Sequence, residues 1–388
     1  MSGELKQLPR PDTCRILEEL LGRAARELFA PAPTDPPAAS APLSADVPPV
    51  PPPPPAHPIT DDENPAEIVA RARQLACGNA DEATLAFLAS QVDVITERYE
   101  QDGPHGLWVQ TKSLRSLGHT LLAGQQPPAA RRELFRITAR AGGLLGYMAV
   151  NIGAFPLAEA YCAEALELSR AIGDLDTELW AGGTQSFAAY YAGRYAEADV
   201  RAAAALDRAP NHPQAIRLLV NGRARALGKL DDRNQAERAI GQALALSDRY
   251  DVVPGLTSCI SFLPYGRART LANALTARVA LQDTKHVLRD AEYLDGLVEK
   301  SDSAWSRSLV RLDVATALLQ QGAPDVEHAM SLGQQAITLA ATLPISSVRQ
   351  RSRDLYERAT PWRNLPAVRE YGEQLRVWGS LPRSAEAG

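Results

Sequence analysis

The sequence contains few cysteines, and none has the spacing of a metal site. Four occur in 388 residues, at positions 14, 77, 162 and 259, and no C-x-x-C motif is present. Zinc ligands come in closely spaced pairs, and small disulfide-stapled domains carry clustered cysteines. The pattern therefore argues against both and favours reduced thiols in a cytoplasmic protein.

Long apolar runs and an excess of basic residues are also missing. No run approaches the roughly 18 apolar residues that a membrane-spanning helix needs, and the first residues do not resemble an export signal. The net charge is −5, whereas nucleic-acid binding requires several Lys or Arg placed against phosphates. We therefore expect a protein that is neither exported nor inserted in a membrane, and direct DNA binding is not favoured.

Catalytic and metal-binding motifs are absent as well. The sequence has no H-E-x-x-H, no G-x-S-x-G and no G-x-x-x-x-G-K-[ST] motif, and no pair of histidines has the i, i+4 spacing of metal ligands on a helix. The glycines of residues 142–146 superficially resemble a phosphate-binding loop, but no buried strand precedes them, so close helix packing explains them better. The prediction is a protein that is not an enzyme and needs no metal or cofactor.

What is abundant points to helices. Apolar residues make up 45% of the chain and aromatic residues only 6%, and Ala, Leu and Arg, which all favour helices, dominate the composition. Small and aliphatic side chains suit close helix-to-helix packing. The expected fold class is all-α.

A proline-rich tract divides the chain. Five consecutive prolines at positions 51–55 end a Pro/Ala-rich stretch, in which missing N–H donors and fixed φ angles prevent helix and sheet. We interpret residues 31–62 as a disordered, semi-rigid linker. A proline-rich ligand for an aromatic groove is the alternative interpretation.

Residues 1–30 are predicted to form a short helical segment, with helices at 13–21 and 24–29 separated by Gly22. The pattern runs Cys14-Arg15-Ile16-Leu17-Glu18-Glu19-Leu20-Leu21-Gly22 and then Glu27-Leu28-Phe29. It resembles the last two helices of helix-turn-helix DNA-binding domains of the xenobiotic-response-element type. In that family the recognition helix precedes these two, and only ten residues stand before them here. The alternative is an amphipathic arm that packs on the rest of the chain.

A motif recurs at intervals near 40 residues from Gly153 onward. In each clear copy a Gly is followed by an Ala five residues later and by Ala-Leu a further seven residues on, as at Gly153 and Gly193. Related copies follow Gly228 and Gly322, and the marker alanines fall at positions 158, 198, 236, 329 and 367. Small Ala lets two helices approach, and Gly permits positive φ between them.

These residues resemble the tetratricopeptide repeat family over roughly residues 131–378. The resemblance implies a right-handed α-solenoid of helical hairpins, which we assign to residues 129–380, followed by a disordered tail at 381–388. Residues 63–128, with helices expected at 82–99 and 107–123, are interpreted as a helical capping region. Stability in such arrays comes from the stacking of neighbours.

The first helix of each hairpin is expected to line a concave groove that binds a peptide or protein partner. Aromatic rings give apolar contact, Arg can hold a carboxylate, and Asn can pair with a peptide backbone. Counting back from each turn gives the candidate groove residues Tyr147, Asn151, Trp180, Phe187, Tyr190, Tyr191, Arg225, Arg269, Asn273 and Thr276. The Lys residues that chaperone-binding repeats use to clamp a carboxylate are missing, so a chaperone-tail receptor is not favoured.

An apolar insertion interrupts the repeats at residues 250–265. Exposed apolar surface of this kind often marks an interface, so the insertion predicts either a homodimer contact or an intramolecular lid over the groove.

The combined features resemble bacterial regulators that join a helix-turn-helix domain to a repeat array. The resemblance implies a cytoplasmic, non-enzymatic protein of transcriptional regulation whose array binds a peptide, small effector or partner protein. The alternative is a protein–protein interaction scaffold in a biosynthetic or secretion assembly.

Overall fold

The computed structural model describes residues 65–250, 252, 256–301 and 303–380. The predicted N-terminal helices, the proline-rich linker and the tail at 381–388 lie outside these residues. Every regular element within them is a helix, with no strand, which confirms the all-α fold class. None of the described helices combines the length and apolar character needed to cross a membrane.

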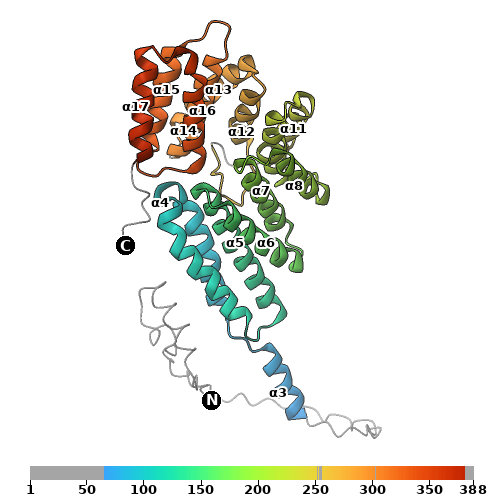
Figure 1. Ribbon diagram of the computed structural model, residues 1–388. Helices are drawn as coiled ribbons and strands as arrows, with labels where there is room; N and C mark the ends of the chain where they lie inside the picture. Colours follow the sequence, from blue (N-terminus) through green and yellow to red (C-terminus); the bar gives the residue numbers. More distant parts are fainter. Residues whose placement is uncertain (1–64, 251, 253–255, 302, 381–388) are drawn as a thin grey trace, which may run out of the picture.

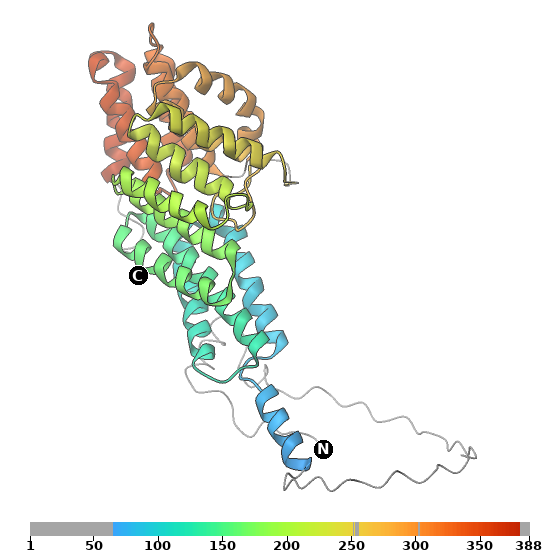
Figure 2. The same ribbon diagram turned by 90° about the vertical axis from the view of Figure 1, so that its right-hand side faces the viewer.

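The first two described helices differ in their packing. Helix α3 (Pro65–Ala76) projects away from the other helices (Figures 1 and 2). Helix α4 (Glu82–Leu122) runs through both helices expected at 82–99 and 107–123, with a kink where Gly103 has a φ of 70° ahead of Pro104. The side chain of Asp81 caps its start, because Oδ1 accepts a hydrogen bond of 2.8 Å from the Thr84 N–H.

The rest of the described chain forms six successive helical hairpins. The first three pair α5 (Pro128–Ile152) with α6 (Phe155–Ile172), α7 (Leu175–Tyr191) with α8 (Tyr195–Arg208), and the segments α9 (Ala215–Arg217), η1 (Leu218–Ala224) and α10 (Arg225–Lys229) with α11 (Arg233–Ser247). The last three pair α12 (Arg267–Ala280) with α13 (Thr284–Glu299), α14 (Ala304–Leu319) with α15 (Val326–Leu339), and α16 (Ser346–Arg358) with α17 (Pro366–Ser380), the last two joined through η2 (Thr360–Trp362). Each first helix contacts the first helix of the next hairpin. Each second helix also contacts the first helix of the next hairpin.

The marker alanines lie where the repeat pattern places them. Ala158, Ala198 and Ala236 are fully buried in α6, α8 and α11, the second helices of three successive hairpins. Ala329 is fully buried in α15, while Ala367 in α17 is half-buried. Small side chains at these positions allow the paired helices to approach.

The expected role of the turn glycines holds at two of four positions. Gly153 and Gly193 have φ angles of 81° and 80°, whereas Gly228 and Gly322 do not have positive φ. After α10 the left-handed position is taken by Asp231, with a φ of 61°. Gly228 instead lies inside α10, where an added Cβ would come within 2.8 Å of the Ala277 carbonyl oxygen in α12. Its small size is therefore needed for a close helix crossing and not for a turn.

The glycines of residues 142–146 lie inside α5, as the helix-packing interpretation requires. A Cβ at Gly143 would lie 2.9 Å from the Trp180 ring, and one at Gly146 would lie 2.6 Å from the Cys162 sulfur. Backbone without side chains thus lets α6 and α7 pack tightly on α5.

The hairpins curve so far that the two ends of the series meet. The ring of Tyr99 in α4 lies 5.3 Å from the Trp305 ring in α14, and Oε2 of Glu100 accepts a hydrogen bond of 2.6 Å from Ser303. Helices α5 and α16 are also in contact, and Figure 1 shows the last hairpins beside the end of α4. The first helices therefore surround a common interior.

Candidate functional site

The ten predicted groove residues all face this interior. They come from α5, α7, α10 and α12, and their exposed fractions range from 0% at Trp180 to 8% at Phe187. The repeat register thus places them on the inner surface, but they are buried and do not line an open trough.

The apolar insertion explains part of this burial, because its described residues fold into the interior. The Trp180 Nε1–H donates to the Ser261 carbonyl oxygen at 3.0 Å, and Nε of Arg269 donates to the Thr257 carbonyl oxygen at 2.6 Å. Arg217 donates to the carbonyl oxygens of Cys259 and Ser261, at 2.6 and 2.7 Å. Residues 256–265 of the insertion therefore lie against the chain's own inner surface, as the lid alternative predicts; a homodimer contact stays a prediction.

All of the predicted residues except Trp180 line one of two adjoining cavities. The larger cavity has a volume of about 450 Å³ and lies between α7, α10, α12, α14 and α16. The smaller cavity, of about 50 Å³, lies toward α4 and α5 and shares Tyr191, Thr276 and Arg351 with the larger one.

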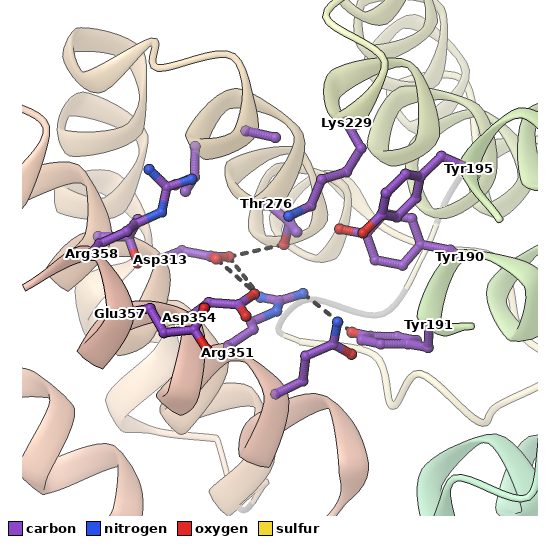
Figure 3. A pocket seen from close by; sticks show the side chains of 14 residues that line it. Tyr190, Tyr191, Tyr195, Lys229, Thr276, Asp313, Arg351, Asp354, Glu357 and Arg358 are labelled. Carbon is purple, nitrogen blue, oxygen red and sulfur yellow. Dashed lines mark hydrogen bonds and ion pairs between the residues drawn. The ribbon is translucent and has the colours of Figure 1, made fainter. Parts of the chain in front are cut away.

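An ion pair forms one wall of the larger cavity (Figure 3). Nη1 of Arg351 donates to both carboxylate oxygens of Asp313, at 3.0 and 2.9 Å, and the Thr276 hydroxyl donates to Oδ2 of Asp313 at 2.9 Å. Burial by itself would lower the pKa of Arg351, but the charge of Asp313 opposes this effect and the pKa is raised above its ordinary value. The Arg351 guanidinium therefore stays charged.

Aromatic rings and a lysine form the opposite wall. The rings of Tyr190 and Tyr195 lie 5.4 Å apart, and Nζ of Lys229 lies 5.9 Å from the centre of the Tyr195 ring. Burial raises the pKa of Tyr190 well above its ordinary value, so its hydroxyl stays protonated and can donate a hydrogen bond. Figure 3 shows these side chains facing Asp313 and Arg351 across the cavity.

The charges that line the larger cavity are balanced. Lys229, Arg351 and Arg358 are basic, and Asp313, Asp354 and Glu357 are acidic. The lining contains no Cys, His or Ser, and no group of three or more His, Cys, Asp or Glu in the described ranges is arranged to hold a metal ion. The cavity offers both charge signs, hydroxyl groups and aromatic faces, which are the elements of a binding site for a zwitterionic ligand.

The smaller cavity is surrounded by aromatic rings and buried polar groups. The Tyr147 and Phe187 rings stack at 5.8 Å, and Nδ2 of Asn151 donates to the Tyr99 hydroxyl at 2.6 Å. Nη2 of Arg225 donates to Oδ1 of Asn273 at 2.7 Å. Five predicted residues from four helices thus pack beside one small space.

Sequence reasoning missed the half of the larger cavity that α14 and α16 provide. Asp313, Arg351, Asp354, Glu357 and Arg358 all belong to these two helices. Their repeats are degenerate, and their contact with α7 depends on the curvature of the whole series. The repeat pattern carries no signal for that curvature.

Comparison of the chain with protein-family models finds no match, and comparison with curated proteins finds none either.

Proposed function

We propose that the six hairpins form a right-handed α-solenoid of tetratricopeptide-like repeats, and that this solenoid binds a short peptide or small zwitterionic effector in the larger cavity. The protein would be a non-enzymatic cytoplasmic regulator. The observation that carries this proposal is the cavity itself, which combines both charge signs with tyrosine faces at the centre of the inner surface.

The repeat assignment is supported by the order of contacts. Each hairpin packs on the next through both of its helices, and the marker alanines occupy equivalent second helices. Repeat proteins gain their stability from such nearest-neighbour contacts.

Size and charge support a small ligand over a whole folded domain. Small-molecule sites have volumes of roughly 300–1,000 Å³, and the larger cavity measures about 450 Å³. A short peptide carries one terminal amine and one terminal carboxylate, which match the acidic and basic groups of the lining.

Native mass spectrometry of the purified chain mixed with randomised tetrapeptides tests this proposal. We expect one-to-one adducts with the wild-type chain and roughly tenfold weaker binding after Asp354→Lys, because the substitution removes an acidic group from the cavity wall. The matched control is Glu373→Lys, on the exposed surface of α17, which should bind like the wild type. Absence of adducts, or equal binding by the Asp354→Lys variant, would contradict the proposal.

A role in transcription rests on the resemblance of residues 1–30 to the end of a helix-turn-helix domain. We propose that the protein acts in this role through a partner. Recovery of RNA polymerase subunits or a DNA-binding protein in a pull-down would favour this role.

The alternative role is a protein–protein interaction scaffold in a biosynthetic or secretion assembly. One observation favours it: a third hollow, of about 320 Å³, lies at the last hairpin and is lined by Tyr356, Leu375 and Trp378 among others. Recovery of enzymes or secretion components in the same pull-down would favour the scaffold.

A further inference from the structure

Arg225 is a buried cation without a negatively charged partner among the described residues. Its exposed fraction is 4%, and none of the ion pairs in this part of the chain includes it. Its hydrogen bond runs from Nη2 to the neutral amide of Asn273, at 2.7 Å, while Nε has no hydrogen-bond partner. The guanidinium also lies 5.8 Å from the centre of the Phe187 ring.

Other buried arginines of the interior are better compensated. Arg351 is paired with Asp313, and Arg278 is paired with Glu237 and Asp290. Arg217 donates to two backbone carbonyl oxygens. Burying a charge without such partners is unfavourable, so an anion bound beside Arg225 would lower the free energy of the folded chain.

Two neighbouring amides also have unused hydrogen-bonding atoms. Nδ2 of Asn273 and Oδ1 of Asn221 are buried without a partner, and both residues line the smaller cavity together with Arg225. Nε of Arg225 and Nδ2 of Asn273 are two unused N–H donors, and a carboxylate has two oxygens to accept them.

The charge around the smaller cavity favours an anion. Its lining includes Arg225, Arg269 and Arg351, of which Arg351 is already paired with Asp313, and only one acidic residue, Glu100. Both oxygens of Glu100 already accept hydrogen bonds, from Ser258 at 2.9 Å and from Ser303 at 2.6 Å. The two cavities adjoin, and Tyr191, Thr276 and Arg351 line both of them.

We propose that Arg225 and Asn273 form the binding site for a carboxylate group of the ligand whose body occupies the larger cavity. This inference rests on the proposed function and names the ligand class: a molecule with an anionic carboxylate at one end. The carboxylate can be the C-terminus of a peptide or belong to a small organic acid, and the chemistry at Arg225 is the same for both.

Thermal unfolding in sodium acetate, compared with sodium chloride at equal ionic strength, tests the site without knowledge of the ligand. A bound anion stabilises only the folded state, so the wild-type melting temperature should rise in a saturable way, by about 2 °C or more. In Asn273→Asp the new carboxylate stands next to Arg225, so this variant should lose the acetate response. The control Asn234→Asp, on the exposed face of α11, should keep it.

Arg225→Met gives an independent test if Asn273→Asp does not fold, and it should also lose the response. An acetate response that survives in either folded variant, or that is missing from the wild type, would overturn the carboxylate site.

Peptide binding separates the two sources of the carboxylate. If the wild type responds to acetate and its affinity for randomised tetrapeptides falls roughly tenfold when they are C-terminally amidated, the ligand is a peptide terminus. If it responds to acetate but binds both pools equally, the carboxylate belongs to an organic acid or an acidic side chain. Equal binding of both pools without an acetate response would refute the carboxylate site and leave the proposed function standing, whereas absence of binding to either pool would refute the proposed function.

Discussion

Cys162 shows how closely the side chains of neighbouring helices are fitted. Its sulfur fills the space that an added Cβ on Gly146 would enter, and its exposed fraction is 0%. Burial raises the pKa of this thiol to about 12, because an apolar environment disfavours the thiolate. Cys77, in contrast, is exposed.

We expect iodoacetamide at pH 8 to modify Cys77 and to leave Cys162 unmodified in the folded protein. Only roughly one thiol in ten thousand is ionised four pH units below its pKa, and the thiolate is the reactive form. Peptide mapping by mass spectrometry measures both sites, with a sample in concentrated urea as the control in which both react. Equal labelling of the two thiols in the folded chain would show that Cys162 is not buried.

The same pKa shift has a defined effect on stability. Because the folded state raises the pKa of Cys162, the folded chain keeps its proton in a range where the unfolded chain has lost it. Stability should therefore decline as the pH rises from about 9 toward 12.

At the residue scale the sequence predicted which side chains face the inner surface better than it predicted which residues contact one another. The repeat register placed Tyr147, Phe187, Arg225 and Asn273 on the inner surface because helical periodicity decides which side of a helix faces its neighbours. It gave no information that Arg351 lies across the cavity from Tyr190, because contacts between distant repeats leave no trace in the local pattern.

Among the helices, the first helix of the third hairpin departs from regular α-helical geometry. The segment η1 (Leu218–Ala224) is π-helical and lies between α9 and α10. Such segments are rare and are often found at functional sites. Here η1 contains Asn221 and directly precedes Arg225, so the irregular turn lies next to the proposed carboxylate site.

The insertion is the second irregular element, and Arg217 connects it to the helices. Arg217→Met removes two charged hydrogen bonds to the backbone of the insertion, each worth roughly 1.5–3 kcal/mol. We expect chymotrypsin to cleave within residues 256–266 at least roughly tenfold faster in this variant, because cleavage follows the population of locally opened chains.

Arg223→Met is the matched control for the insertion. Arg223 lies in the adjoining segment η1 of the same hairpin and pairs with Asp199 in α8, at 2.7 Å. Its loss should leave cleavage of the insertion unchanged. Equal cleavage rates in the Arg217→Met variant and the wild type would show that the insertion is not held in the interior through Arg217.

At the element scale the sequence predicted helices and hairpins but not these two irregularities. The marker alanines identified the second helices because only a small side chain fits at a close crossing. The apolar character of residues 250–265 indicated a buried contact without showing which surface it covers, since the same composition suits a dimer and a lid.

For the molecule as a whole, the smaller cavity depends on closure, by which we mean the contact between the two ends of the series of hairpins. Closure brings α4 and α5 against α14 and α16. The smaller cavity is lined by residues from both ends, and the larger cavity is lined by α14 and α16 opposite the middle hairpins. The sequence could not predict this closure, because a small change in rotation per hairpin accumulates over the series.

The most direct test of closure is a double-mutant cycle between Glu100 and Ser303, which are 203 residues apart in sequence and joined by a hydrogen bond of 2.6 Å. Urea unfolding of the wild type, Glu100→Ala, Ser303→Ala and the double variant gives the coupling free energy, and the cycle cancels the separate role of Ser303 in capping α14. We predict a coupling of about 1 kcal/mol or more, as expected for a hydrogen bond to a charged group. Additivity of the two substitutions within about 0.3 kcal/mol would mean that the ends do not meet and that the smaller cavity, which both residues line, does not form.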